Sequence, residues 1–343
     1  MRKLLQALPF LFILTSHPAF AQNAMVDKIQ FFVDTSIIDA TITTNMPDLL
    51  RKKQKDGSYF AHFFATLPDG SSVDEPIVLE VRGHFRKDYC YLPPLKIIFK
   101  SKETSAMKPL GSLKLVSQCK TSLYDDQNLL KEFLVYKIYN LFTDMSFRVR
   151  LLNLSLVDST KKKKTITEHA FLLEDIKDVA KRNNCSDWKK AKLFTESTDR
   201  RQMTLVAIFQ YMIGNTDWAV PNDHNIRLIM SKVDSSSRPY VVPYDFDYSG
   251  FVNTDYAIPD EKLSIQSVRD RLYRGFPRTM QELNEVLDIF RKKREDIYKL
   301  IDDFYLLTKA NRNNLKAYLD DFFILINQPQ QIYEIFILFA RTE

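Results

Sequence analysis

The residues best suited to chemistry lie in two stretches in the second half of the chain. The first runs from Asp217 to Asn225, and the second is Pro243-Tyr244-Asp245-Phe246-Asp247. Local patterns predict a helix before Asp217, a strand that begins after Asn225, and another strand that ends just before Asp245. Because the two strands would form a hairpin, we expect Asn225 and Asp245 to lie close together.

Carboxylate and amide oxygens of this kind suit a hard divalent cation. Mg²⁺ is usually held by one or two carboxylates together with substrate phosphates. Asn225 and Asp245, with Asp247 as a further ligand, could therefore hold Mg²⁺ or Mn²⁺, and Asp217 could act as a base or orienting group. Protein kinases use this order of base Asp, metal Asn and metal Asp in phosphoryl transfer. The alternative is that these residues only cap turns, because Asn and Asp favour loops.

Glycine spacing excludes several enzyme classes. The chain has seven glycines, and no two of them lie within ten residues of each other. Dinucleotide-binding and Walker A loops need closely spaced glycines, since side chains would keep the backbone away from the phosphates. The GxSxG and HExxH motifs are also absent. P-loop enzymes, typical Rossmann dehydrogenases, common serine esterases and zincin peptidases are therefore excluded.

The N-terminus has the pattern of a cleavable secretory signal at residues 1–21. Arg2 and Lys3 precede an apolar run at 4–14, and Ala19-Phe20-Ala21 supplies small residues for cleavage after Ala21. A retained membrane anchor is the alternative, but the run is too short to span a hydrocarbon core of about 30 Å. We expect an exported protein, periplasmic or secreted, with no transmembrane segment in the mature chain.

Charge and cysteine content limit the partners and the compartment. The net charge of +6 is weak and dispersed, so nucleic acid is not an expected partner. Cys90 and Cys119 flank neighbouring predicted strands and are the expected disulfide pair in an oxidising compartment, which leaves Cys185 over. No CxxC occurs, and a zinc site built from Cys or His is not expected.

The hydrophobic pattern divides the chain into a strand-rich first part and a helical second part. A helix that starts at Asp125 or Asp126 should run to about Phe142, and another, capped by Thr198, should stop at Gly214. Beyond about residue 260 we expect three or four amphipathic helices. Strands are predicted at 37–43, 59–67, 77–85, 95–100, 113–116, 149–157, 165–173, 226–230 and 240–243. Those at 59–67 and 77–85 flank the turn signal Pro68-Asp69-Gly70-Ser71 and should pair as a hairpin.

This series of elements resembles the CotH-type atypical kinases, whose fold is a degenerate protein kinase. The resemblance rests on Val81-Arg82-Gly83 and on segments 94–99, 128–139, 171–176, 215–225 and 243–247. It implies an α+β, two-lobed protein-kinase-like fold. A strand-rich N-terminal lobe at 22–175 would be followed by a helical C-terminal lobe at 176–343 that carries the catalytic and metal hairpin.

The resemblance also implies a role for each matched residue. Asp217 would be the catalytic aspartate, and Asn225, Asp245 and Asp247 would bind the metal. The cofactor-binding residues would be Lys96, directed toward ATP phosphates, Arg82, and Glu132 as the ion-pair partner of Lys96. Gly83-His84-Phe85-Arg86 departs from the family pattern, in which small polar residues follow the Arg-Gly pair.

These expectations lead to an exported, Mg²⁺-dependent phosphotransferase that acts on a secreted protein or on a surface glycan or lipid. The expected phosphodonor is ATP or another compound, because ATP is scarce outside the cytoplasm. One rival is a non-catalytic envelope or surface binding protein on the same scaffold, since a fold does not fix a function. Another is a metal-dependent hydrolase that uses the same carboxylates.

Two basic stretches have open interpretations. Four arginines between Arg269 and Arg278 could clamp phosphate or carboxylate groups. The favoured alternative is a helix end whose arginines pair with Asp260, Glu261 and the acidic loop. Similarly, the lysines at 161–164 could attract an anion, but a solvated hairpin tip is favoured.

Overall fold

The computed structural model describes residues 26–342, apart from positions 54, 56, 84, 100–105, 190, 191 and 235. The predicted signal sequence at 1–21 lies outside these residues. None of the helices in the described ranges combines the length and the apolar character needed to cross a membrane.

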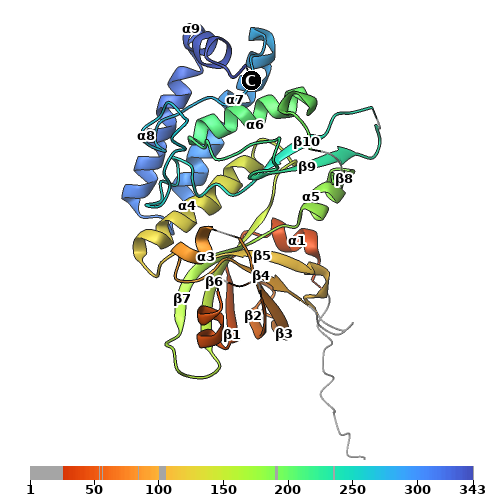
Figure 1. Cartoon of the computed structure of the whole chain (residues 1–343), viewed down its shortest axis with the longest axis vertical. Helices are drawn as coiled ribbons and strands as arrows, with labels where there is room; N and C mark the ends of the chain where they lie inside the picture. The colour runs from red at the N-terminus through yellow and green to blue at the C-terminus, as the bar shows by residue number, and fades with distance from the viewer. Residues whose placement is uncertain are drawn as a thin grey trace, which may run out of the picture.

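Seven strands close into a barrel in the order β1-β2-β3-β4-β5-β7-β6 (Figure 1). Neighbouring strands are antiparallel, except that β1 pairs in parallel with β6 and so closes the barrel. The strands are β1 (Ile38–Thr44), β2 (Ser58–Thr66), β3 (Ser72–Val81), β4 (Leu95–Ile98), β5 (Ser112–Val116), β6 (Val149–Asp158) and β7 (Ile166–Leu173).

Strict alternation along the strands fills the barrel with apolar side chains. In β2 every second residue is buried, and Phe63 lies in the same core as Leu79 of β3 and Ile97 of β4. Gly70, at φ +81°, lies in the turn between β2 and β3. This hairpin was predicted from the turn signal around Gly70, and the strand pairing confirms it.

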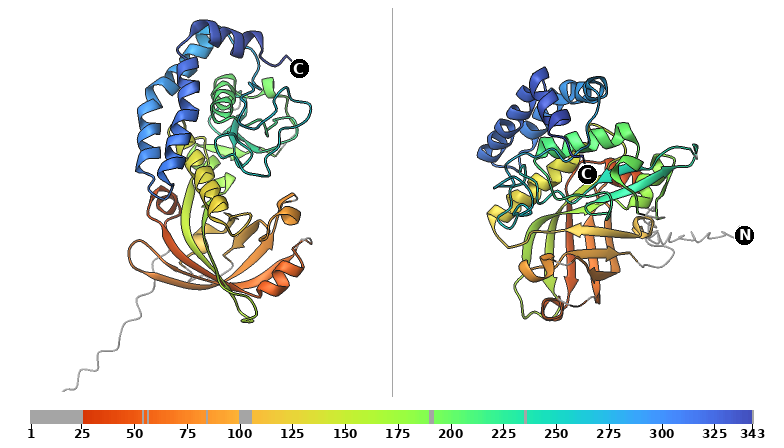
Figure 2. Two further views of the ribbon diagram at one scale, coloured as in Figure 1. Left: turned by 90° about the vertical axis from the view of Figure 1, so that its left-hand side faces the viewer. Right: turned by 45° about the horizontal axis from the view of Figure 1, so that its top comes forward.

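The longer helices pack beyond one end of the barrel, whereas the short helices α1 and α2 contact its strand β6. Helix α4 lies between the barrel and helices α6, α7 and α8 (Figure 2), and it contacts β6, β7 and α7. A three-stranded sheet, ordered β10-β9-β8, joins the helices, so the predicted β9–β10 hairpin gains a third strand. The longer helices are α4 (Leu123–Asn140), α5 (Ile176–Arg182), α6 (Arg200–Ile213), α7 (Met280–Asp303) and α8 (Lys309–Leu325). The strands of this sheet are β8 (Cys185–Asp187), β9 (Ile226–Ser231) and β10 (Tyr240–Pro243). The short helices are α1 (Lys28–Val33), α2 (Met46–Arg51), α3 (Phe85–Tyr89) and α9 (Pro329–Tyr333).

The expected two-lobed protein-kinase-like fold with a helical C-lobe is wrong. The strands form a closed, mixed seven-stranded barrel, and the part that follows contains a sheet as well as helices. Closure depends on β1 pairing with β6, in a register from Ile38 opposite Leu152 to Thr44 opposite Asp158. No local pattern specifies a pairing between segments so far apart in the chain, because alternation fixes only which face of each strand is buried.

Helix termini differ slightly from the prediction. Ser122, rather than Asp125 or Asp126, caps α4 by accepting a hydrogen bond from the Asp125 N–H. Asp199, rather than Thr198, caps α6. Gly214 ends α6 in the left-handed conformation, as predicted.

The cysteines behave as predicted. Cys90 and Cys119 form a disulfide, and Cys185 is a buried free thiol.

Candidate functional site

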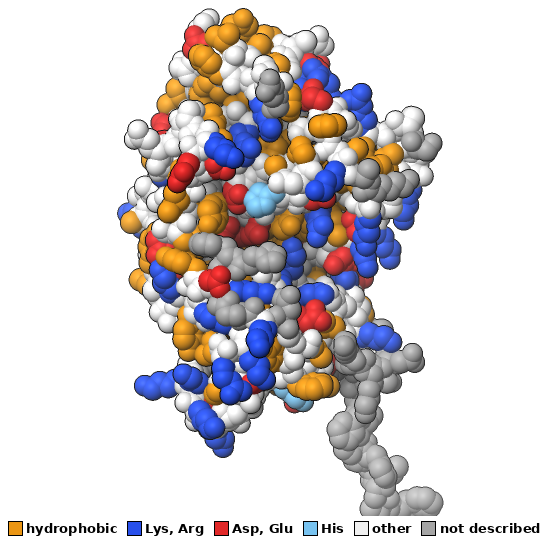
Figure 3. Space-filling view, in the orientation of Figure 1, with side chains coloured by type: hydrophobic (Ala, Val, Ile, Leu, Met, Phe, Trp, Pro, Cys, Tyr) orange, Lys and Arg blue, Asp and Glu red, His pale blue; other side chains and the backbone are white. Residues whose placement is uncertain are grey.

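Acidic and basic side chains meet where the barrel faces the helical part. In Figure 3, acidic side chains and a histidine lie in a hollow near the middle of the molecule, with lysines and arginines below them. The side chains of this region come from the loop after α6, the turn after β10, helix α4 and the segment from β3 to β5.

Two neighbours hold Asp217 in the loop after α6. His224 Nε2 lies 2.6 Å from Asp217 Oδ1, and the amide of Asn225 donates to Asp217 Oδ2 at 2.8 Å. The same amide also donates to the Asp217 carbonyl at 2.8 Å. An isolated antiparallel β-bridge between Ala219 and His224 closes the loop that brings these residues together. The Asp217 carboxylate is therefore oriented but remains about 35% exposed.

The turn after β10 places two more carboxylates nearby. Asp245 has φ +64°, and its N–H donates to the Tyr136 hydroxyl of α4 at 2.9 Å. Phe246 is fully buried, and its ring packs 4.8 Å from Tyr136 and 5.8 Å from Phe209 of α6. Asp247 is buried and accepts a hydrogen bond from the Tyr256 hydroxyl at 2.8 Å.

The carboxylates of this region perturb one another. Burial, and then the charge of Asp245, raises the pKa of Asp247 to about 6, while Arg86 opposes the shift. Burial followed by the charges of Asp247 and Asp245 raises the pKa of Glu132 well above its usual value. Such shifts arise where buried negative charges exceed the positive charges close to them.

The residues fit a divalent cation in their chemistry. Glu132 Oε1 is buried and has no hydrogen-bond partner. The small cavity that it lines is also lined by Asp125 and Asp247, and hard cations prefer carboxylate oxygens. Within the described ranges, no three His, Cys, Asp or Glu side chains form a ready metal cage. Mg²⁺ commonly takes only one or two protein carboxylates and completes its shell with phosphate and water. The assignment of Asn225, Asp245 and Asp247 as its ligands stays a prediction.

The implied ion pair between Lys96 and Glu132 is not formed. Lys96 Nζ lies 3.3 Å from Glu80 on the neighbouring strand β3. The guanidinium groups that oppose the raised pKa of Glu132 are instead those of Arg86 and Arg82. Strand pairing explains the difference, since Lys96 and Glu80 are direct cross-strand partners.

A cationic cavity of about 370 Å³ lies beside Asp245. Lys114 of β5 is directly opposite Lys96 of β4, and its ammonium lies 4.2 Å above the Tyr244 ring. Burial and the nearby Arg82 lower the pKa of Lys114 to about 8, and Asp245 opposes this shift. The charged residues that line the cavity are Arg82, Lys96, Lys114, Lys177, Arg227, Glu174 and Asp175.

A second cavity, of about 750 Å³, has Asp217 in its wall. Trp218, Tyr248 and Ile258 give it an apolar side, and Asp260 and Glu261 add negative charge.

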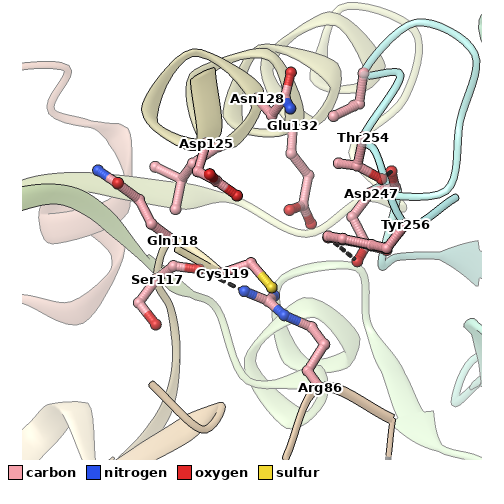
Figure 4. Close-up of a pocket in the computed structure, with 12 residues that line it drawn as sticks. Arg86, Ser117, Gln118, Cys119, Asp125, Asn128, Glu132, Asp247, Thr254 and Tyr256 are labelled. Atoms are coloured by element: carbon pink, nitrogen blue, oxygen red, sulfur yellow. Dashed lines mark hydrogen bonds between the residues drawn. The ribbon is translucent and has the colours of Figure 1, made fainter. Parts of the chain in front are cut away.

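A much smaller cavity, of about 20 Å³, lies between Arg86, Glu132 and Asp247 (Figure 4). Its volume is sufficient for about one water molecule. Arg86 donates to the Ser117 carbonyl at 2.6 Å.

Sequence reasoning missed Lys114 and Arg86 as members of the site. The Lys114 position could have been inferred from its strand, because it alternates with buried leucines in β5. Nothing local marks Arg86.

Of the two basic stretches, the arginines between Arg269 and Arg278 make contacts within the fold, and the lysines at 161–164 face solvent. Arg271 and Arg274 donate to backbone carbonyls, Arg269 stacks on Tyr318, and Arg278 pairs with Glu196. The favoured pairing with Asp260 and Glu261 is therefore replaced by these contacts, which tie the loop to α6 and α8. The lysines at 161–164 are exposed at the β6–β7 turn, as favoured.

No protein-family model matches the chain, and a search of curated proteins found no match. Neither comparison assigns the chain to a family, so the resemblance to the CotH-type kinases stays a prediction.

Proposed function

We propose that this site carries out divalent-cation-dependent phosphoryl transfer outside the cytoplasm, onto a secreted protein or a surface glycan or lipid. The observation that supports it best is the position of Asp245. This carboxylate acts on the pKa values of Arg82 and Lys114 on one side and of Glu132 and Asp247 on the other. In the chain it lies between Tyr244, whose ring is 4.2 Å from the Lys114 ammonium of the cationic cavity, and Asp247, which lines the small cavity with Glu132. The proposal does not require a kinase-like fold.

Each part of the site would have a separate role. Arg82, Lys96 and Lys114 would bind the phosphates of ATP or of another phosphodonor, because several cations line that cavity. Asn225, Asp245 and Asp247 would hold Mg²⁺ or Mn²⁺, which would neutralise charge on the transferred phosphoryl group.

Asp217 would accept the proton of the acceptor hydroxyl as that oxygen bonds to phosphorus and the donor oxygen leaves. Its contacts with His224 and Asn225 hold the carboxylate in one orientation, which is the main contribution that a positioned base makes. The cavity of about 750 Å³ beside it offers room for the acceptor.

The cation site is tested by thermal unfolding with Mn²⁺ or Mg²⁺, with and without a nucleotide. Ligand at 100 times its Kd should add about 2.7 kcal/mol to the free energy of unfolding. Asp245→Asn should abolish this gain, because it removes a ligand charge. Asp234→Asn is the control, since Asp234 is exposed in the hairpin between β9 and β10. Equal gains in both variants would contradict the assignment.

Asp217→Asn tests the chemistry. It should lower kcat for phosphoryl transfer by about 10²–10⁴-fold, because it removes the proton acceptor. Cation binding should stay intact, because the remaining side-chain oxygen can still accept the hydrogen bond of the Asn225 amide. Transfer of labelled phosphate to an envelope extract is the measurement. An unchanged cellular phenotype with no nucleotide effect would favour the non-catalytic binding protein. Phosphoester turnover without a donor would favour the hydrolase.

A further inference from the structure

The disulfide between Cys90 and Cys119 lies at the edge of the proposed site. Cys119 lines the small cavity together with Arg86, Glu132 and Asp247. Figure 4 shows its sulfur beside the Arg86 guanidinium, with the Glu132 and Asp247 side chains around the same cavity. The disulfide is connected to the carboxylates by two separate sets of contacts.

The first connection runs through Arg86. This residue belongs to α3 (Phe85–Tyr89), which has only five residues and is too short to be stable without tertiary support. Cys90 follows α3 directly, and Arg86 Nε lies 3.5 Å from its sulfur. Arg86 also donates to the carbonyl of Ser117, two residues before Cys119. The disulfide therefore joins the two segments that Arg86 bridges.

The second connection runs through Tyr256. Its ring packs with Cys90 and Cys119 in a small hydrophobic cluster of their own, and its hydroxyl donates to Asp247 Oδ2 at 2.8 Å. Hydrogen-bond partners of a metal-binding carboxylate orient it and tune its affinity. The disulfide thus supports the residue that orients Asp247.

We propose that the Cys90–Cys119 disulfide is a redox-controlled clamp, which holds Arg86 and Tyr256 in the positions that make the carboxylate cluster competent to bind a cation. The clamp rests on the proposed function for the use of that cation. In it, Arg86 is a positioning residue, because it acts through Glu132 and Asp247. The consequence is a site that assembles only in an oxidising compartment.

The redox step is ordinary thiol–disulfide exchange. A disulfide oxidant takes two electrons from the two thiols as the S–S bond forms; the two thiol protons end on the reduced oxidant, which becomes a dithiol. A dithiol reductant reverses the step.

The clamp is separate from the parts that hold the fold together. The cluster around the disulfide is distinct from the barrel core and from the core of the helical part. Loss of the bond should therefore loosen α3 and the segment around Ser117 and leave the two large cores folded.

The test compares Mn²⁺ affinity by calorimetry in the oxidised protein, the protein reduced with dithiothreitol, and the reoxidised protein. We expect the Kd to rise about 10- to 100-fold on reduction, the usual effect of losing a partner of a metal ligand, and to recover on reoxidation. Because both cysteines are buried, thiol titration must confirm reduction. A Cys90→Ser, Cys119→Ser double variant should match the reduced protein, and Cys185→Ser, at a buried free thiol, should match the oxidised one.

Substitution of Arg86 tests the clamp independently of the redox state. Arg86→Met should weaken Mn²⁺ binding as reduction does, with the disulfide still formed. Arg86→Lys should restore part of it, since an ammonium can still donate to the Ser117 carbonyl but lacks the guanidinium fork.

The outcomes separate the two proposals. If the oxidised wild-type protein does not bind Mn²⁺, the proposed function is contradicted, and the clamp is overturned with it. If it binds and confirmed reduction leaves the Kd unchanged, only the clamp is overturned. Loss of cooperative thermal unfolding on reduction and in the double variant would also overturn the clamp, because the bond would then support the whole fold.

Discussion

At the residue scale, the position of Phe246 determines where the two neighbouring carboxylates lie. Its ring is fully buried between α4 and α6, so Asp245 and Asp247 cannot move to solvent without unpacking it. Asp247 is thereby kept buried despite the cost of removing a charge from water. Burial of an uncompensated acid raises its pKa, and the same effect acts on Glu168 of β7.

Replacement of Glu168 should change how stability depends on pH. Burial, with the nearby Asp126 adding to it, raises the pKa of Glu168 to about 8 against the opposing charge of Arg86. The folded protein therefore keeps a proton that the unfolded chain releases. This stabilisation is complete below the unfolded pKa and is lost as the pH rises through about 8, at up to about 1.4 kcal/mol per pH unit.

Glu168→Gln should remove that slope, because the amide is neutral at every pH. Urea unfolding at pH 6 and pH 8 measures it, and Glu295→Gln on the exposed side of α7 controls for the change in net charge. A slope that persists in Glu168→Gln would show that another group carries it.

At the element scale, the end of α6 sets the position of Asp217. Gly214 adopts φ +66° and returns the chain into the loop that Asn215 begins. The Asn215 side chain then accepts a hydrogen bond from the Asp217 N–H at 3.0 Å. The end of α6 and the loop that carries Asp217 are thus one continuous unit.

Gly214→Ala should destabilise the fold more than an alanine at another left-handed glycine. An added Cβ at Gly214 would lie 2.1 Å from the Tyr318 hydroxyl oxygen, whereas at Gly70 nothing lies within 4 Å. Gly70→Ala should cost about 1–2 kcal/mol for its backbone conformation alone. Gly214→Ala should cost about 1–3 kcal/mol more, because the site is overpacked. Denaturant unfolding decides, and equal costs would show that Tyr318 moves aside freely.

At the scale of the whole molecule, the two hydrophobic cores support different residues of the site. The barrel core supports the strands that bear Arg82, Lys96 and Lys114, and the core of the helical part contains Phe246. Asp217, Asn225, Asp245 and Asp247 all come from segments that pack on the second core. Stability and cation binding should therefore be separable.

Leu154→Ala, inside the barrel, should cost about 2–5 kcal/mol and leave the Mn²⁺ affinity of the folded protein unchanged. Phe246→Ala should cost about 3–5 kcal/mol and also weaken Mn²⁺ binding, because it frees the turn between Asp245 and Asp247. Unfolding and calorimetry on both variants provide the comparison. Equal losses of affinity would mean that the barrel positions the cation ligands.

Local features of the sequence predicted most of the elements and part of the site. Alternation placed most strands to within a few residues, but β3 begins five residues before its predicted start and β8 was not predicted. The turn at Gly70 gave the β2–β3 hairpin, and flanking strands gave the Cys90–Cys119 pair. The hairpin from Asn225 to Asp245 followed from the same reasoning, and the Asn225 N–H₂ contact with Asp217 adds to it. The role of these residues in catalysis stays a prediction.

The sequence by itself determined which segments become strands and helices and which faces they bury, because those properties depend on neighbours within a few residues. Only the tertiary structure decided that β1 closes the barrel against β6, that Lys96 pairs with Glu80, and that Arg86 comes to lie beside Glu132. These contacts join residues far apart in the chain, where many pairings satisfy the same local pattern. The packing of the whole molecule, and the charge left buried by it, selects one of them.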